Sequence, residues 1–249
     1  MGIPARLSCG QRLDDGQECP SYHSRAAMFN LAAPPNFRGL DPHVPVTVYY
    51  RHLPHWRQED ATYYVTFHLN DALPEAKVRE LKGLRREWES RHPPPRSKDH
   101  WESYARQFAV KAERWIDEGH GRCYFAEPAH AKKLADAMLF FHDQRYQLFG
   151  YVVMPNHCHL IVKPIAGHCL EGILRAWKGY VAWQINRAVG GSGTIWQQES
   201  YDRIVRDEEH LYRVVQYIGH NPAKAGLPPD RWYRWIHPRW QQAGWNFVD

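Results

Sequence analysis

Hydrophobic and polar residues alternate along the stretch ATYYVTFHL, where every second residue from Tyr63 to Leu69 is large and apolar. This period of two predicts a β-strand. The next apolar residues recur every three or four positions, first from Val78 to Trp88 and then from Trp101 to Trp115. That spacing predicts two amphipathic helices, separated by the break at Pro93-Pro94-Pro95.

The same reasoning predicts the rest of the chain. Further elements are a short strand over 122–125, a helix from Pro128, two antiparallel strands over 146–154 and 157–162, a helix over 170–189, an extended segment over 196–206, and a helix from Asp207 to about 221–222. This order predicts an α+β fold in which an antiparallel central sheet is flanked by helices.

The chain also divides by composition. Residues 1–45 mix Gly, Pro, Ser and charges without periodicity, which predicts a poorly ordered N-terminal tail with order beginning near Thr62. We assign 46–230 to one domain and interpret 75–118 as a helical insertion that packs without taking part in chemistry. Residues 231–249 form an aromatic and basic C-terminal tail, which could stack on bases or pack as a terminal segment.

Composition narrows the class of protein only a little. The 32 Lys and Arg against 27 Asp and Glu give a net charge of +5, which is compatible with a polyanionic partner. The five cysteines form no CxxC pair, so neither a disulfide framework nor a zinc site is favoured. With no long apolar run and no signal-peptide core, we expect a cytoplasmic protein.

The stretch VVMPNHCHLIV carries the first candidate chemistry. On a strand, His157 and His159 share one face with Ile161, while Cys158 and Leu160 face the other way. Neighbouring imidazoles can share a metal ion. With 16 histidines in 249 residues, however, about one His-x-His pair is expected by chance, so the spacing alone favours hydrogen-bonded histidines without a metal.

Two predicted helices each carry a tyrosine followed four residues later by an amide. The pairs are Tyr180 with Gln184 and Tyr217 with Asn221. At this spacing both side chains lie on one helix face, so either pair could present a nucleophilic phenol beside an amide ligand for a hard metal. Packing is the simpler role for either tyrosine, and the residues alone do not choose between the pairs.

Taken together, five segments resemble the HUH nucleases, in particular the REP-associated tyrosine transposase group of single-tyrosine transposases. They occur in family order between about residues 50 and 227: RHLPHWRQEDATYYVTFHL, RYQLFGYVVMPNHCHLIVKP, ILRAWKGYVAWQINR, IWQQESYDRIVRDEEHL and YIGHNPAKAGL. Cys158 fills the middle position of the histidine motif, where the family usually has a bulkier hydrophobic residue. The N-terminal tail and the insertion depart from the compact family pattern.

The resemblance implies a ferredoxin-like HUH nuclease fold and a specific chemistry. Tyr217 would be the nucleophile, and Asn221 would join His157 and His159 in holding Mg²⁺ or Mn²⁺. The implied reaction is cleavage and strand transfer of single-stranded DNA, folded into hairpins, through a 5′-phosphotyrosine intermediate. Tyr180 would then pack or face DNA.

The basic residues of the matching segments are candidate DNA contacts: Lys178, Arg203, Arg206 and Lys224. Solvated surface charge is the alternative for each of them. The resemblance is compatible with either a monomer or a homodimer.

Two other functions remain open. One is a domesticated protein that binds hairpin DNA without transposing it. The other is a metal hydrolase or cupin-like enzyme, which would need a third histidine or a carboxylate ligand and for which Tyr217 would be dispensable.

Overall fold

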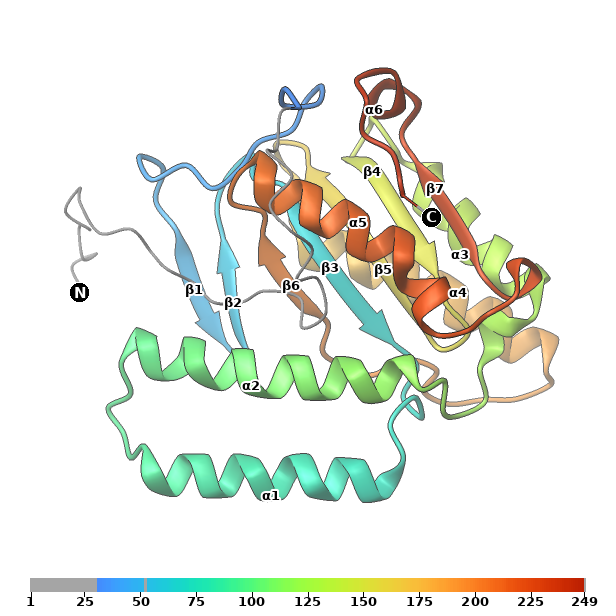
Figure 1. Ribbon diagram of the computed structural model, residues 1–249. Helices are drawn as coiled ribbons and strands as arrows, with labels where there is room; N and C mark the ends of the chain where they lie inside the picture. Colours follow the sequence, from blue (N-terminus) through green and yellow to red (C-terminus); the bar gives the residue numbers. More distant parts are fainter. Residues whose placement is uncertain (1–30, 52, 249) are drawn as a thin grey trace.

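Five antiparallel strands form the central sheet, in the order β6-β3-β5-β4-β7, which confirms the expected α+β class (Figure 1). The structure is a computed structural model that describes residues 31–51 and 53–248. The strands are β1 (Thr47–Tyr50), β2 (Pro54–Arg57), β3 (Tyr63–His68), β4 (Tyr146–Val153), β5 (His157–Pro164), β6 (Tyr201–Ile204) and β7 (Tyr233–Ile236). The helices are α1 (Glu75–Arg91), α2 (Lys98–Asp117), α3 (Pro128–Phe140), α4 (Leu170–Ala188), α5 (Glu208–Lys224) and α6 (Pro238–Gln242), with short 3₁₀ turns at Tyr124–Ala126 and Pro229–Arg231.

The central strand β5 separates two hydrophobic layers. Cys158, Leu160 and Val162 pack in the layer under α3 and α4, while Ile161 packs in the layer under α5. The alternation expected for this strand is therefore confirmed, and His157 and His159 face α5. Because β5 pairs with β3 along one edge and with β4 along the other, it is a central strand, and the two layers cover its two faces.

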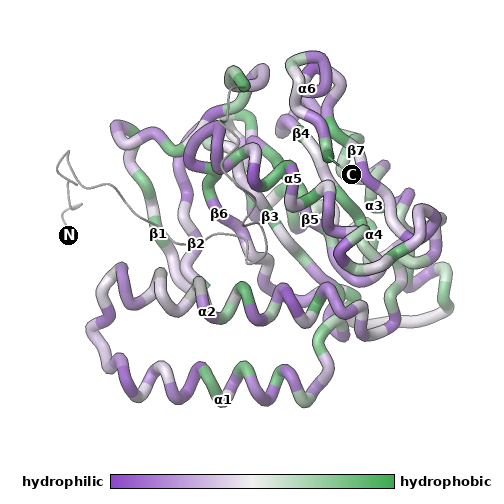
Figure 2. The backbone as a smooth tube through the Cα atoms, viewed as in Figure 1, coloured by the Kyte–Doolittle hydropathy of each residue, from purple (hydrophilic) through white to green (hydrophobic). Residues whose placement is uncertain are grey.

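The α1–α2 hairpin is inserted between β3 and α3 and crosses one end of the sheet (Figure 1). It is mostly hydrophilic, with apolar residues at intervals along each helix (Figure 2). Ring contacts join the two helices, with Trp88 centred 4.7 Å from Tyr104 and 5.6 Å from Trp101. Both helices were predicted from the apolar spacing, and both form.

Residues 31–45 do not behave as the poorly ordered tail that the composition predicted. Trp240 Nε1 donates to the Pro35 carbonyl (3.0 Å) and Trp245 Nε1 to the Ala32 carbonyl (2.9 Å), and Phe37 is buried. The C-terminal tryptophans Trp240 and Trp245 thus pack against this segment. β7, within that region, was not predicted. The first 30 residues, with Cys9 and Cys19, lie outside the described part.

Two local predictions are wrong. The strand predicted over 122–125 does not form; a 3₁₀ turn over Tyr124–Ala126 follows Cys123, whose φ of 48° is left-handed. Helix α5 does not end at 221–222 but continues through Pro222 to Lys224. A proline so near a helix end removes only one backbone hydrogen bond, and Pro222 is buried in the packed helix, so the helix continues past it. As a result, Asn221 lies within α5, on the same face of the helix as Tyr217.

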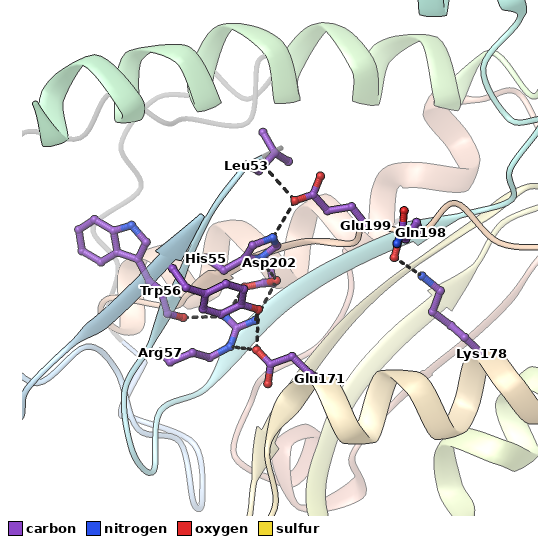
Figure 3. A network of polar contacts seen from close by, with 10 residues as sticks. Leu53, His55, Trp56, Arg57, Glu171, Lys178, Gln198, Glu199 and Asp202 are labelled. Carbon is purple, nitrogen blue, oxygen red and sulfur yellow. Dashed lines mark hydrogen bonds and ion pairs between the residues drawn. The ribbon is translucent and has the colours of Figure 1, made fainter. Parts of the chain in front are cut away.

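A buried ionic network fixes the β1–β2 hairpin to β6 and α4 (Figure 3). His55 Nδ1 lies 2.7 Å from Asp202, and its Nε2 lies 2.9 Å from Glu199. Arg57 forms ion pairs with Asp202 and, at 2.6 Å, with Glu171 of α4. Burial alone would lower the pKa of His55, but the hydrogen bonds to the two carboxylates raise it to about 9.

The network predicts a pH-dependent stability. Because the pKa of His55 is higher in the folded than in the unfolded protein, its stabilising effect is complete below about pH 6.5 and is lost as pH rises through about 9. We expect wild type to lose on the order of 1–3 kcal/mol of unfolding free energy between these pH values, relative to His55→Gln. Urea unfolding of both proteins across this range measures the difference. If the unfolding free energies of the two proteins changed with pH in parallel, the raised pKa of His55 would be contradicted.

The C-terminal segment clamps the face of α5 that points away from the sheet. Gln216 Nε2 donates to the Asn246 carbonyl (2.9 Å), and the Val248 amide donates to Gln216 Oε1 (2.9 Å). A Cβ added to Gly219 would lie only 2.8 Å from Phe247 Cβ. The glycine is therefore required by a close approach of the chain.

This contact reverses the usual effect of replacing glycine in a helix. We expect Gly219→Ala to lower the unfolding free energy by about 1–3 kcal/mol through overpacking. Gly83→Ala in α1, where a Cβ meets nothing within 4 Å, should raise it by up to about 1 kcal/mol. Chemical denaturation measures both. Equal stabilisation by the two substitutions would show that Phe247 does not pack on Gly219.

Candidate metal centre

Two fully buried imidazoles lie side by side on β5, facing α5. His157 and His159 are 1% and 0% exposed, and their ring centroids are 4.7 Å apart. Unpaired buried polar groups cost about 1–3 kcal/mol each, so the partners of every ring nitrogen matter.

The protonation of His157 Nδ1 is set by its hydrogen bond to Asn156. Asn156 uses its amide nitrogen to donate to the carbonyls of Ile116 (3.1 Å) and His120 (3.0 Å), so its oxygen faces His157 as an acceptor. His157 Nδ1 lies 2.7 Å from that oxygen and must carry the proton. The lone pair is therefore on Nε2, the atom that points to Asp117 at 3.6 Å.

His159 is oriented by a chain of hydroxyl groups that ends at a carboxylate. Its Nδ1 lies 2.8 Å from both Thr66 Oγ1 and the Tyr64 hydroxyl. Thr66 donates to Tyr64 (3.2 Å), and Tyr64 donates to Glu113 (3.1 Å), so His159 Nδ1 is again the donor. The lone pair of His159 is on Nε2. Hydrogen bonds of this kind commonly orient metal-bound histidines.

Helix α5 places a tyrosine and an amide against these rings. Asn221 Nδ2 lies 3.2 Å from His159 Nε2, and the Tyr217 ring is centred 5.3 Å from the His159 ring. Both residues are buried, at 1% and 7% exposed. The pair from α5, and not the pair from α4, is thus brought to the histidines.

Helix α2 adds two carboxylates that the sequence interpretation missed. Asp117 contacts His157 as described, while its other oxygen pairs with Lys224 at 2.6 Å. Glu113 lies one turn earlier, with an oxygen 3.9 Å from His159 Nδ1. The inserted hairpin therefore brings two carboxylates to the histidines. The i, i+4 spacing of the two acids was the available signal, but it is common on solvated helix faces.

Burial keeps both imidazoles neutral. It lowers the pKa of His157 to about 3 and that of His159 well below its usual value. Burial, and then the charge of Asp117, raise the pKa of Glu113 to about 7, against interactions with the Tyr217 and Tyr64 phenols that lower it. Burial also raises the pKa of Asp117, although the paired Lys224 lowers it.

The possible ligand atoms at this centre suit a divalent cation. Within the described residues, three buried atoms at this point make no hydrogen bond: Asp117 Oδ1, His157 Nε2 and Asn221 Oδ1. Ligand atoms of Asp117, His157 and His159 all lie within 4.8 Å of one another. Two neutral imidazoles with a carboxylate and an amide oxygen form a mixed nitrogen and oxygen set suited to a first-row divalent metal.

A second cluster of similar composition does not fit a metal. His142, Asp143 and His237 also place ligand atoms within 4.8 Å of one another. However, His142 Nδ1 accepts from the Leu148 amide (3.1 Å) and His237 Nδ1 from the Arg239 amide (3.1 Å). The neutral rings therefore carry their protons on Nε2, where a metal would bind.

The candidate DNA contacts lie in different places. Lys224 is exposed and contacts the centre through its ion pair with Asp117. Arg203 is opposite Tyr64 in the β3–β6 register and so shares the histidine face of the sheet, and Arg206 follows β6. Lys178 lies on α4, under the opposite face, where it donates to the Gln197 carbonyl (2.7 Å) and burial lowers its pKa to about 8.

Tyr180 also lies on α4. It is 49% exposed and accepts a hydrogen bond from Gln184 (2.9 Å). Since α4 packs on the sheet face away from the histidines, this pair takes no part in the buried centre.

Comparisons with known proteins give limited similarity. The sequence matches no family model. An uncharacterized protein of Haemophilus influenzae is 28% identical over 107 residues, which cover 34% of this chain and 57% of that protein. A solved REP-associated tyrosine transposase bound to a REP hairpin covers 72% of this chain and 74% of its own, with 16% identity and a TM-score of 0.34. Among the described helices, none is long and apolar enough to span a membrane.

The centre predicts a metal-induced stabilisation that depends on α2. At Mn²⁺ concentrations about 100 times Kd, binding to the folded state should add about 2.7 kcal/mol. We expect Asp117→Asn to lose most of this increase, because it removes the carboxylate charge at nearly constant volume. Asp143→Asn, in the second cluster, should retain it. Thermal denaturation with and without Mn²⁺ makes the comparison, and the opposite ranking of the two variants would contradict the site.

Proposed function

We propose that the protein is a metal-dependent tyrosine nuclease and strand transferase acting on single-stranded DNA, as in the HUH transposases. The observation that carries the proposal is the meeting of α5 with β5. One face of a single helix presents Tyr217 and Asn221 to two neutral, lone-pair-bearing histidines. The five sequence segments that resemble REP-associated tyrosine transposases support the same chemistry.

The reaction would proceed at phosphorus. The Tyr217 oxygen forms a bond to the scissile phosphate, and the bond from phosphorus to the 3′ oxygen breaks. The products are a 5′-phosphotyrosine link and a DNA end that takes up a proton to become a 3′ hydroxyl. Attack by another 3′ hydroxyl reverses the step and joins strands without ATP, since the phosphotyrosine retains the bond energy.

Three groups around the phenol suit this role. Glu113 interacts with the Tyr217 phenol and can accept its proton, because the pKa of Glu113 is near 7. The Lys224 ammonium lies 5.7 Å from the centre of the Tyr217 ring, where it favours a phenolate. His159 packs edge-on against the ring and limits its motion.

The cation would be held by His157, His159 and Asn221, with Asp117 as a further ligand. When bound, Mg²⁺ or Mn²⁺ would neutralise charge on the phosphate oxygens and position the scissile bond. Two imidazole ligands favour Mn²⁺ over Mg²⁺.

One observation also favours a second candidate. A metal hydrolase that uses water as nucleophile needs a carboxylate beside the two histidines, and Asp117 supplies one. In that enzyme no covalent adduct would form and Tyr217 would be dispensable. A protein that binds hairpin DNA without cleaving it is the remaining alternative.

The proposal predicts a covalent protein–DNA adduct. We expect wild type to capture molecules from a labelled pool of randomised single-stranded DNA in the presence of Mn²⁺, visible on a denaturing gel. Tyr217→Phe removes one oxygen and should lower adduct formation by at least about 10³-fold. Tyr180→Phe, the matched change on α4, should leave it within about twofold.

Other outcomes separate the alternatives. An adduct lost only in Tyr180→Phe would place the nucleophile on α4. DNA cleavage without an adduct that persists in Tyr217→Phe would identify a metal hydrolase. Hairpin binding with neither adduct nor cleavage would indicate a binding protein.

A further inference from the structure

A cavity of about 540 Å³ lies between the α1–α2 hairpin and the β3–β6 edge of the sheet. We refer to it as the hairpin cleft. Its walls are residues of α1 and α2 on one side and of β3, β6 and the segment before β6 on the other. The volume is within the range of ligand-binding pockets, about 300–1,000 Å³.

One end of the hairpin cleft adjoins the residues that orient His159. Thr66 and Glu113 line the cleft, and both belong to the hydrogen-bond chain that orients His159. A strand with its scissile phosphate at His159 would therefore have an adjacent nucleotide at this end of the cleft. The inference rests on the proposed function for this placement of the strand.

The chemistry of the lining suits a flat ring with polar edges. Phe108 and Tyr104 supply adjacent aromatic rings, with centroids 4.1 Å apart, and Leu81 adds an apolar surface. Gln197 supplies an amide at the opposite wall. His68 also lines the cleft, and its Nδ1 donates to the Leu69 carbonyl (2.8 Å), which leaves Nε2 as an acceptor.

Cations on the α1 side can contact an anionic backbone. Lys82 and Arg85 line the cleft from α1, where Arg85 also pairs with Glu89 (2.9 Å), while the carboxylates Glu113 and Glu199 line the opposite parts of the cavity. An unstacked nucleotide presents an aromatic base to a ring-lined pocket and a phosphate to nearby cations, which is the usual arrangement for single-strand recognition. A purely apolar ligand would not match the polar wall formed by His68 and Gln197.

We propose that the hairpin cleft binds one unstacked nucleobase of the single-stranded DNA, next to the scissile phosphate. The α1–α2 hairpin then has two roles: its end supplies carboxylates to the metal centre, and its inner face selects the nucleotide beside the cleavage point. Sequence preference at that nucleotide comes from the edge contacts of His68 and Gln197.

The test measures DNA binding in a Tyr217→Phe background, so that cleavage does not intervene. A tight-binding sequence is selected from randomised single-stranded DNA by filter binding, and each nucleotide in turn is replaced by an abasic site. We expect one abasic position to weaken binding by about tenfold or more, as the loss of one stacked base implies. Fluorescence anisotropy provides the dissociation constants.

Three variants assign that base to the hairpin cleft. Phe108→Ala removes an aromatic wall, so the loss of affinity caused by the abasic site (the abasic penalty) should fall to about threefold or less. Leu81→Trp fills the cleft, so it should weaken binding of the intact DNA and leave binding of the abasic DNA nearly unchanged. Phe140→Ala, an exposed ring on α3 at the opposite sheet face, should behave like the parent. Retained Mn²⁺-induced stabilisation verifies the fold of each variant.

The outcomes are distinct from those of the adduct experiment. An unchanged abasic penalty in both Phe108→Ala and Leu81→Trp would show that the base does not bind in the hairpin cleft. It would not contradict the proposed nuclease function. Failure to select any single-stranded DNA would overturn the cleft as well. A cleft-dependent base preference without adduct formation would support the cleft in a protein that binds DNA without cleaving it.

Discussion

The structure depends on the burial of two neutral imidazoles whose lone pairs point at a carboxylate and an amide. A protein interior accepts such atoms only when something compensates their lost hydration. Here the Nδ1 atoms are satisfied by Asn156 and by Thr66 with Tyr64, and His159 Nε2 accepts from Asn221 Nδ2. His157 Nε2, Asp117 Oδ1 and Asn221 Oδ1 make no hydrogen bond among the described residues. A divalent cation would compensate these atoms, and the proposed chemistry follows from its binding there.

Three elements far apart in the sequence must meet for this arrangement to form. β5 supplies the histidines, α5 the tyrosine and the amide, and α2 the carboxylates. The sheet buries β5 between β3 and β4, and the C-terminal segment holds α5 through Gln216 and Gly219. The geometry of the candidate metal centre therefore depends on the central sheet and on packing of the C-terminal segment. The α1–α2 hairpin belongs to the same centre, although its sequence looks like a solvated insertion.

Local rules predicted much of this fold and part of the site. Strand alternation placed His157 and His159 on one face, and helical spacing placed Tyr217 beside Asn221. Neither rule could choose between Tyr217 and Tyr180, because that choice depends on which helix packs on which face of the sheet. Asp117 and Glu113 were missed for a related reason: an i, i+4 pair of acids is common on exposed helices. The packing of residues 31–45 escaped prediction because its partners, Trp240 and Trp245, lie some 200 residues away.

The most direct test of the central claim is pulsed electron paramagnetic resonance of the protein loaded with Mn²⁺. Directly bound imidazoles produce characteristic ¹⁴N couplings, so we expect couplings from two histidines in wild type. Replacing either His157 or His159 with alanine should remove one of them. A spectrum of Mn²⁺ surrounded by water alone, or couplings that survive both substitutions, would contradict a metal centre at the meeting point of β5, α5 and α2.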